Sequence, residues 1–264
     1  MMIIEILIYA LSGVVTGLLA GLLGIGGGLI LVPVLSSVFL IFLQTEYIVH
    51  LAIATSLATI LVTGLSSVIS HHYERAVQWQ VFRAMLIGIL VGGFVGAWSS
   101  QFFSTFWLSK LFGVMEIMAG LYMIRGKPPH ADRCLPGFLP LNTVGLGIGS
   151  LSALLGIGGG SISTPYLQWH NLVMQKAIAT SAAIGLPIAL AGTLGYMLGG
   201  LQVENLPAYT TGFVYWPAFI AIVSMSVFTA YLGAKLAHRL PIKALKRMFG
   251  LLLIALGIKM LFFS

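Results

Sequence analysis

A run of glycines that occurs twice constrains the fold of this chain more than any other feature. The pentapeptide Gly-Ile-Gly-Gly-Gly spans residues 24–28 and again residues 156–160, both times between long apolar segments. A proline follows the last glycine of each copy after five residues, as Pro33 and Pro165. Consecutive glycines are costly inside a helix, so we expect a helix to break at each copy. Two breaks at matching places in an apolar chain point to the binding site of a transporter.

The composition places these breaks in a membrane. Hydrophobic residues make up 59% of the chain and charged residues 7%, whereas a soluble domain carries about 25% charged residues. The apolar segments reach the roughly 20 residues that a helix needs to cross a bilayer. We therefore predict an all-α polytopic membrane protein. The net charge of +7 comes from Lys and Arg in short clusters between these segments, which indicates membrane topology and not nucleic-acid binding.

The chain reads as two repeats of about five apolar segments each. A second repeated pentapeptide, Ala-Ile-Ala-Thr-Ser, at residues 52–56 and 177–181, extends the match between the halves. We assign residues 1–125 to the first repeat, 126–137 to a polar cytoplasmic linker and 138–264 to the second repeat. The expected segments are 3–23, 28–43, 47–70, 80–103 and 107–125, and then 139–155, 160–173, 175–200, 211–235 and 244–263.

The positive charges set the expected orientation, because loops rich in Lys and Arg stay in the cytoplasm. Such loops lie near residues 71–83, in the linker and at 238–247, whereas the connections without Lys or Arg are 44–46, 102–106 and 201–210. Five crossings per repeat satisfy this pattern, place both termini outside and relate the repeats by inversion. Four crossings would put the basic 238–247 loop outside, so we reject that count. Whether the short second segments cross the membrane or enter it and return stays open.

The segment after each glycine run is too short to span a bilayer. In the second repeat it extends only from Ser161 to about His170, roughly 15 Å of helix against ~30 Å of hydrocarbon. A helix that begins inside the membrane leaves its first N–H groups without partners, and such an end binds a small oxyanion well. Alternatively, the glycines only let helices pack closely. The backbone candidates for substrate binding are Gly26, Gly27, Gly28, Gly158, Gly159 and Gly160.

Hydroxyl groups near the glycine runs are the next candidates. The repeated Ala-Ile-Ala-Thr-Ser supplies one Thr and one Ser to each half, and the short segment of the second half adds two serines. Such hydroxyls can instead bond to a carbonyl of their own helix or to a neighbouring helix. The candidates for substrate binding are Thr55, Ser56, Thr180, Ser181, Ser161 and Ser163, and those for helix breaks or hinges are Gly24, Pro33, Gly156 and Pro165.

One acidic residue lies deep in an apolar segment. Glu116 is near the middle of segment 107–125, and an ionisable group at such a depth is a functional candidate. We expect a role in proton coupling. The alternatives are that Glu116 pairs with Lys110 or faces a cytoplasmic crevice. The histidines at 71, 72 and 170 lack the spacing to carboxylates or cysteines that a metal site requires, so we predict no metal.

With these residues, the chain resembles the TauE/SafE family of sulfite exporters. The likeness rests on the glycine-proline motif of residues 17–33, its copy at 149–165, the Ala-Thr-Ser stretches and the sequence Arg-Ala-Val-Gln-Trp at 75–79. It covers essentially the whole chain. The resemblance implies transport of small sulfur-containing anions, such as sulfite and sulfonates, across the bacterial inner membrane. The family is described with fewer spans than the segments counted here, and counting the short segments as half-spans reconciles the two.

We predict a secondary exporter of small sulfur-containing anions such as sulfite or organosulfonates. Coupling to protons and alternating access, with one repeat rocking against the other, are the expected mechanism. The chain has no Gly-x-x-x-x-Gly-Lys-Ser/Thr sequence for ATP hydrolysis. An anion channel is the nearest alternative and a membrane-embedded enzyme a more distant one, because no constellation of catalytic side chains is evident. The expected partners are the substrate anion and lipid, without a cofactor or nucleic acid, and the oligomeric state stays open.

Overall fold

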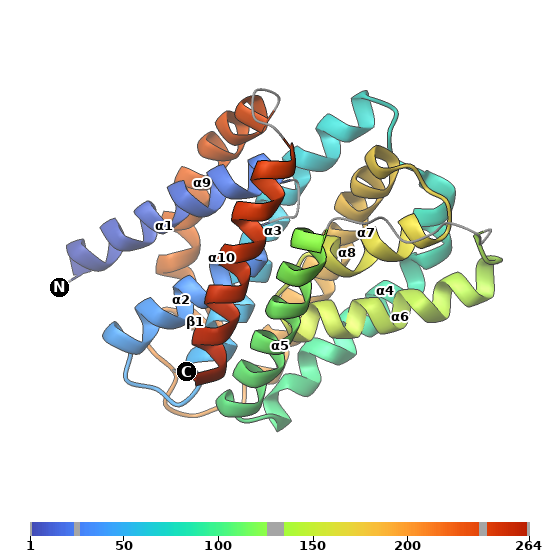
Figure 1. The fold of residues 1–264 in the computed structure, drawn as a ribbon. Coiled ribbons are helices and arrows are strands. Elements are labelled where there is room, and N and C mark those ends of the chain that lie inside the picture. Colours follow the sequence, from blue (N-terminus) through green and yellow to red (C-terminus); the bar gives the residue numbers. More distant parts are fainter. Residues whose placement is uncertain (1, 24–26, 126–134, 238–241, 263–264) are drawn as a thin grey trace.

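A computed structural model describes residues 2–23, 27–125, 135–237 and 242–262 (Figure 1). These residues form ten α-helices, one 3-10 turn and a short hairpin. The first half contains α1 (Met2–Leu23), α2 (Gly28–Phe42), α3 (Ile48–Tyr73), α4 (Trp79–Ser99), the 3-10 turn η1 (Ser100–Phe102) and α5 (Thr105–Arg125). The second half contains α6 (Phe138–Leu154), α7 (Gly160–Trp169), α8 (Met174–Gly200), β1 (Thr210–Thr211), β2 (Val214–Tyr215), α9 (Trp216–Ala237) and α10 (Ile242–Phe262).

The helices have the length and composition of membrane spans. Four of those in the described residues are long and apolar enough to cross a bilayer: Ile48–Tyr73, Trp79–Phe102, Thr105–Arg125 and Met174–Gly200. Shorter apolar helices accompany them, and many large apolar side chains on their outer faces are exposed, as lipid contact requires. The predicted all-α polytopic membrane architecture is confirmed. Most of the linker, residues 126–134, lies outside the described residues.

Two long helices, α3 and α8, form the centre of the molecule. They run antiparallel, since Gly64 lies against Leu186 while Leu57 lies against Gly192. Most of the length of both helices is buried. The short helices α2 and α7 pack on the first halves of α3 and α8. The core of the protein is therefore built from the segments that carry the repeated motifs.

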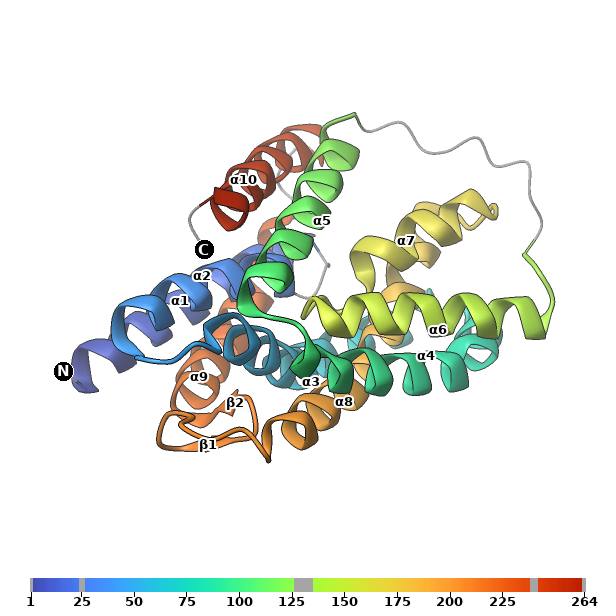
Figure 2. The ribbon, with the colours of Figure 1, turned by 90° about the horizontal axis from the view of Figure 1, so that it is seen from below.

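The outer helices pair across the two halves. Helix α1 packs along α9 and α4 along α6 (Figure 2). Both pairs run parallel in very close contact, because a Cβ on Gly13 would lie 2.6 Å from the carbonyl oxygen of Ile222, and one on Gly92 would lie 2.1 Å from that of Leu146. The glycines spaced four apart, which are Gly13 and Gly17 on α1 and Gly88, Gly92 and Gly96 on α4, therefore allow this close packing. Neither half packs only on itself.

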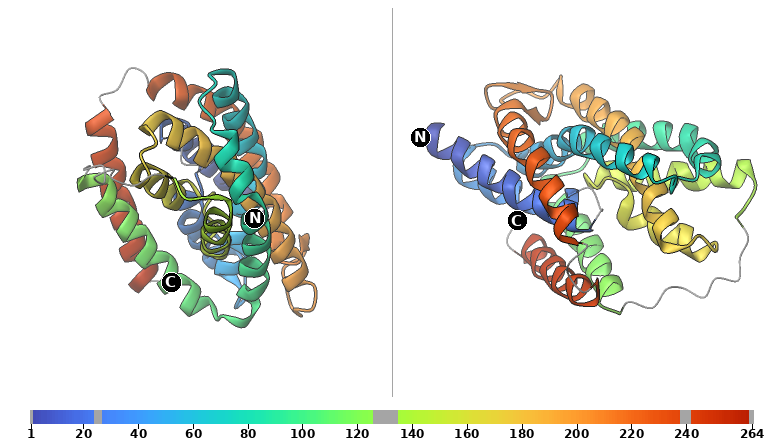
Figure 3. Two further views of the ribbon diagram at one scale, coloured as in Figure 1. Left: turned by 90° about the vertical axis from the view of Figure 1, so that its right-hand side faces the viewer. Right: turned by 90° about the horizontal axis from the view of Figure 1, so that it is seen from above.

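Helices α5 and α10 form a third pair, which runs antiparallel (Figure 3). Glycines face each other at two levels: Gly113 lies against Gly257, and Gly120 lies against Gly250. A Cβ on Gly120 would lie 2.6 Å from the carbonyl oxygen of Gly250. The side chains between these two levels therefore lie in a tight interface.

The segment predicted as a helix from residue 211 begins instead with the hairpin β1–β2, and α9 starts at Trp216. Gly212 has φ +54, and a Cβ there would lie 2.1 Å from the carbonyl oxygen of Met197, so only glycine fits this turn. Thr55 Oγ1 accepts the N–H of Tyr215 at 3.1 Å. This turn and its contact with α3 override the apolar run Phe-Val-Tyr-Trp that suggested a longer helix.

The connections predicted to share one side of the membrane do lie together. Thr105 Oγ1 donates a hydrogen bond to the carbonyl of Glu46, which joins the α4–α5 connection to the α2–α3 connection. The ring of Phe213, at the tip of the hairpin, lies 5.5 Å from that of Tyr47. All three connections thus meet at one end of the molecule.

Candidate functional site

Each short helix begins at a glycine in the left-handed conformation. Gly27, with φ 73, precedes α2, and Gly159, with φ 77, precedes α7. No side chain caps either helix. Gly156, the first glycine of the second motif, lies in the connection between α6 and α7 and is also left-handed, with φ 68. These conformations are strained for any other residue type, so the turns account for glycine at positions 27, 156 and 159. Gly24 and Gly26 lie outside the described residues.

The two glycine motifs meet in the middle of the protein. A Cβ on Gly28 would lie 2.4 Å from the carbonyl oxygen of Gly156, which is closer than atoms without a bond approach. Ser56 Oγ, from α3, donates to the same carbonyl at 3.3 Å. The backbone of the first motif therefore rests directly on that of the second, with one repeated serine between the halves.

The start of each short helix faces the middle of a long one. Gly28 lies against Ile60 of α3, and a Cβ on Gly185 of α8 would lie 2.3 Å from the carbonyl oxygen of Gly158. Because α3 and α8 are antiparallel, α2 and α7 approach from opposite ends. Their N-termini, with the positive ends of their dipoles, therefore converge at the centre.

The prolines are not where the helices break. Pro33 lies inside α2 and Pro165 inside α7, and both helices continue beyond them. The chain turns at the glycines instead, where the left-handed conformations are found. Both prolines are near enough to the helix start that only one intrahelical hydrogen bond is lost. Pro33 and Pro165 therefore do not break their helices, contrary to the expectation from sequence, and Gly156 lies in a turn between α6 and α7.

The repeated threonines hold other helices in place. Thr180 Oγ1 accepts the N–H of Gln78 at 3.0 Å, just before α4, and donates to the carbonyl of Lys176 at 2.7 Å. Thr55 Oγ1 accepts the N–H of Tyr215, just before α9. Each threonine thus binds the start of the fourth helix of the other half. Both hydroxyls thus bond to the protein backbone, which the sequence left open as the alternative to substrate binding.

Three of the four predicted serines lie on α7, which follows the second motif, or on α8. Ser163 Oγ donates to the carbonyl of Gly159 at 2.7 Å and so closes the first turn of α7. The hydroxyls of Ser161 and Ser181 are buried, and neither has a hydrogen-bond partner within the described part of the chain. Ser161 directly follows the second motif, and Ser181 lies on the neighbouring helix α8. A buried hydroxyl without a protein partner can bond a ligand.

Glu116 lies in the interface between α5 and α10. Its side chain is 0% exposed, and neither carboxylate oxygen has a hydrogen-bond partner among the described residues. A Cβ on Gly257 would lie 3.1 Å from the Glu116 Cβ, so the acid faces α10. The ammonium of Lys110 lies instead over the ring of Phe106, 5.0 Å from its centre. The alternative of an ion pair with Lys110 is therefore not what the structure contains.

Sequence reasoning missed one buried ionisable residue. His50 lies in the first turn of α3 and is 1% exposed. The signal was present, since a histidine inside an apolar segment is a functional candidate in the same way as Glu116. Its partners could not be anticipated, because they belong to residues fifty positions further along the chain.

Converging glycine-started half-helices inside a polytopic helical membrane protein define a membrane transporter, and not an enzyme. Residues 9–260 match the family described as Sulfite exporter TauE/SafE. The chain belongs to this family.

Relatives of full length carry consistent names. A probable membrane transporter protein of Haemophilus influenzae is 32% identical, and the alignment covers 97% of both chains. The probable membrane transporter protein YunE of Bacillus subtilis is 27% identical over 97% of both chains. A probable membrane transporter protein of Methanocaldococcus jannaschii is 27% identical over 94% of this chain and 92% of its own. No solved structure matches the chain.

Proposed function

We propose that this membrane transporter is a secondary exporter of small sulfur-containing anions, such as sulfite or organosulfonates. The observation that carries the proposal is the convergence of the N-termini of α2 and α7 where Gly28 meets Gly156. Two helix N-termini aimed at one point create a positive potential without a charged side chain. A small oxyanion fits such a point because its oxygens accept hydrogen bonds from backbone N–H groups.

The hydroxyls divide into two groups in this proposal. Ser161 and Ser181 have no hydrogen-bond partner among the described residues and would complete the hydrogen bonds of the anion. Ser56 already bonds Gly156, and Ser163 already bonds Gly159, so these two hold the turns in shape. Thr55 and Thr180 position the helices that follow. The site is therefore asymmetric, with its free hydroxyls on the second half.

We infer that the two halves are inverted repeats in the bacterial inner membrane, with both termini outside. The antiparallel contacts of α3 with α8 and of α5 with α10 support this inference, since equivalent helices of inverted repeats run in opposite directions. In alternating access, each rigid group of helices would then contain helices from both halves, such as α1 with α9 and α4 with α6. Rocking of one whole repeat against the other, as expected from sequence, would separate Gly13 from Ile222 and Gly92 from Leu146.

Proton coupling is assigned to Glu116 in this proposal. Its carboxylate is fully buried and has no hydrogen-bond partner in the described part of the chain, and a charge in such a place is costly. The group is therefore expected to be neutral in the state described here and to ionise only when the α5–α10 interface opens. Its equivalent in the second half is Leu253, so this acid is present in one half alone.

Sulfite flux in liposomes tests the proposal. The purified protein is reconstituted, and sulfite uptake is measured with and without an imposed pH gradient, with sulfate and a short sulfonate as comparators. Saturable flux that the gradient drives uphill is the expected result. Saturable flux that only runs downhill would favour a channel or uniporter. Absence of flux for all three anions would overturn the assignment to sulfur oxyanions.

A further inference from the structure

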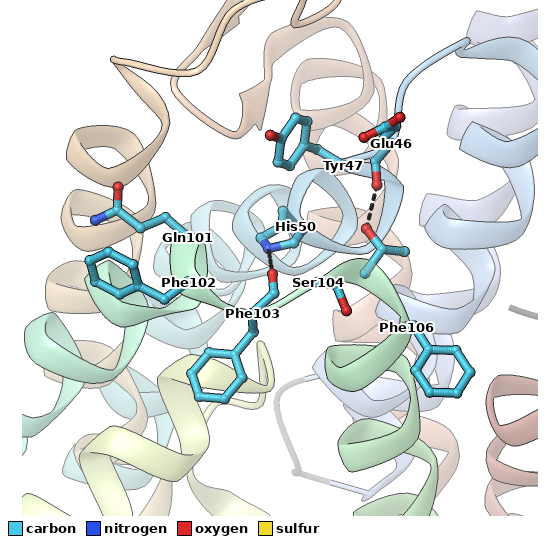
Figure 4. A pocket seen from close by; sticks show the side chains of 9 residues that line it. Glu46, Tyr47, His50, Gln101, Phe102, Phe103, Ser104 and Phe106 are labelled. Carbon is cyan, nitrogen blue, oxygen red and sulfur yellow. Dashed lines mark hydrogen bonds between the residues drawn. The ribbon is translucent and has the colours of Figure 1, made fainter.

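A pocket of about 380 Å³ lies at the end of the molecule where the α2–α3 and α4–α5 connections meet. Figure 4 shows side chains that come from the start of α3 on one side and from the turn between α4 and α5 on the other. The polar residues that line it are Glu46, Tyr47, His50, Gln101, Ser104 and Thr105. No Lys or Arg lines this pocket, so it does not suit an anion. It is large enough for several water molecules.

His50 lines the pocket and is 1% exposed. Its Nε2 lies 3.1 Å from the carbonyl oxygen of Ser100 and 3.1 Å from that of Phe103. Carbonyls only accept hydrogen bonds, so Nε2 must carry a hydrogen. In the neutral ring the lone pair is then on Nδ1, which is buried and has no hydrogen-bond partner among the described residues. Nδ1 therefore has a free lone pair, which can accept a hydrogen bond or bind a proton.

The surroundings of His50 contain few other groups that titrate. On its own side these are Glu46, which is exposed, and Tyr47, whose ring lies 5.5 Å away. The α4–α5 turn has no titratable side chain and bonds His50 through carbonyls, and the hairpin offers the neutral ring of Phe213 at 5.0 Å. Tyr196 approaches from α8 on the far side of Phe213. Burial of the ring opposes a positive charge here, and two carbonyls and one exposed carboxylate are the groups that would offset that cost.

A series of buried contacts leads from His50 to the second glycine motif. Ser100, whose carbonyl binds His50, has its hydroxyl near that of Tyr196, but the Ser100 hydroxyl makes no hydrogen bond among the described residues, so the two side chains are joined by packing alone. Tyr196 Oη donates to the carbonyl of Leu154 at 2.9 Å. Leu154 is the last residue of α6, two positions before the left-handed Gly156. Ser100 and Tyr196 are both 0% exposed, so this series is shielded from solvent.

We propose that His50 is a proton-binding site which faces the pocket side of the membrane and controls transport through Ser100, Tyr196 and the turn at Gly156. Nδ1 is buried in the state described here, so a hydronium ion from the pocket reaches it only when the pocket wall moves. It then gives its proton to Nδ1 and leaves water, and the ring becomes an imidazolium. Nε2–H then binds the carbonyls of Ser100 and Phe103 more strongly, because the donor is charged. The inference rests on the proposed proton-linked transport and adds a second proton site, distinct from Glu116.

The pH profile of transport tests this role. Sulfite flux is measured in liposomes as the pH on the pocket side is varied between about 5 and 8, the range in which histidine titrates. For wild type, flux is expected to follow the protonated fraction of one group, which changes by about tenfold across one pH unit on each side of its midpoint. His50→Gln should lose this dependence. An unchanged profile would show that His50 only supports the α4–α5 turn and would overturn the proposal.

Glu46→Gln gives a second test that does not depend on replacing a buried residue. Removing the exposed carboxylate at the pocket should move the midpoint of the flux profile to lower pH, because a negative charge favours the imidazolium. Glu204→Gln is the matched control, since Glu204 is an exposed acid that does not line the pocket. Equal midpoints for Glu46→Gln and Glu204→Gln would contradict the proposal.

Nuclear magnetic resonance separates this proposal from the identity of the substrate. With ¹⁵N-labelled histidine, His50 should start as the Nε2–H form and gain a hydrogen on Nδ1 as the pH falls. A resonance that stays neutral until the protein unfolds would overturn the proton site. Absence of sulfite flux together with a normal titration would instead overturn only the proposed substrate.

Discussion

Replacing Gly28 by alanine tests whether the two glycine motifs act as one site. The added Cβ would lie 2.4 Å from the carbonyl oxygen of Gly156 and 3.0 Å from Cδ1 of Ile60. The Ile60 side chain can turn away, but the carbonyl belongs to the backbone of the opposing motif. Alanine favours the helix by about 1 kcal/mol relative to glycine, whereas overpacking costs about 1–3 kcal/mol. Because a backbone carbonyl at 2.4 Å cannot turn away, the overpacking cost lies in the upper part of this range, at about 2–3 kcal/mol. The expected net loss of stability is therefore about 1–2 kcal/mol.

Two measurements follow this change. Thermal unfolding in detergent should show Tm lowered by about 2–8 °C, since 1 kcal/mol shifts Tm by about 2–4 °C in a protein of this size. Sulfite flux per folded molecule should fall as well, because the alanine separates the converging helix N-termini. The flux is therefore compared at a temperature well below both melting points.

Gly147→Ala provides the control. Gly147 lies inside α6, and a Cβ there would have no atom within 4 Å. This change should leave flux unaltered and raise Tm slightly, because only helix propensity changes. If Gly28→Ala matched Gly147→Ala in both Tm and flux, the contact between the motifs would have no energetic or functional weight, and the reasoning would be refuted.

Three further changes test other parts of the site. Gly159→Ala should lower the free energy of unfolding by roughly 1–2 kcal/mol, because its backbone is left-handed. In Gly158→Ala the new Cβ meets only the Ile60 side chain, at 3.3 Å, so equal Tm values for the two variants would refute the conformational argument. Thr180→Val removes the acceptor of the Gln78 N–H and should cost about 1–3 kcal/mol, and an unchanged Tm would contradict this. Glu116→Gln should abolish uphill sulfite accumulation but retain downhill flux, and accumulation like that of wild type would discredit proton coupling through this residue.

The sequence predicted the helices well because their ends carry local signals. Segments 28–43 and 160–173 begin where the glycine runs end, and the structure starts α2 at Gly28 and α7 at Gly160. The hairpin before α9 was missed, since its residues are apolar and its turn depends on the contact of Gly212 with Met197, a contact made in the folded protein.

The site was harder to predict than the helices. That Gly28 rests on Gly156 follows from how the two halves pack, and no spacing within either motif indicates it. The roles of Thr55 and Thr180 depend on N–H groups of the opposite half. His50 was passed over because its carbonyl partners follow α4. Local patterns thus identified the glycines, whereas the partners of the polar side chains required the three-dimensional arrangement.

The crossed contacts of the two threonines bear on how the chain is made. Thr55 cannot form its hydrogen bond with Tyr215, and the glycine face of α1 cannot pack on α9, until most of the protein has left the ribosome. Helices inserted early must therefore remain in the bilayer with their packing faces uncovered, where a chaperone or the insertion machinery could hold them. A chain cut after residue 125 would keep its hydrophobic segments but lack the partners of α1 and α4. Separately expressed halves would regain stability only by meeting each other in the membrane.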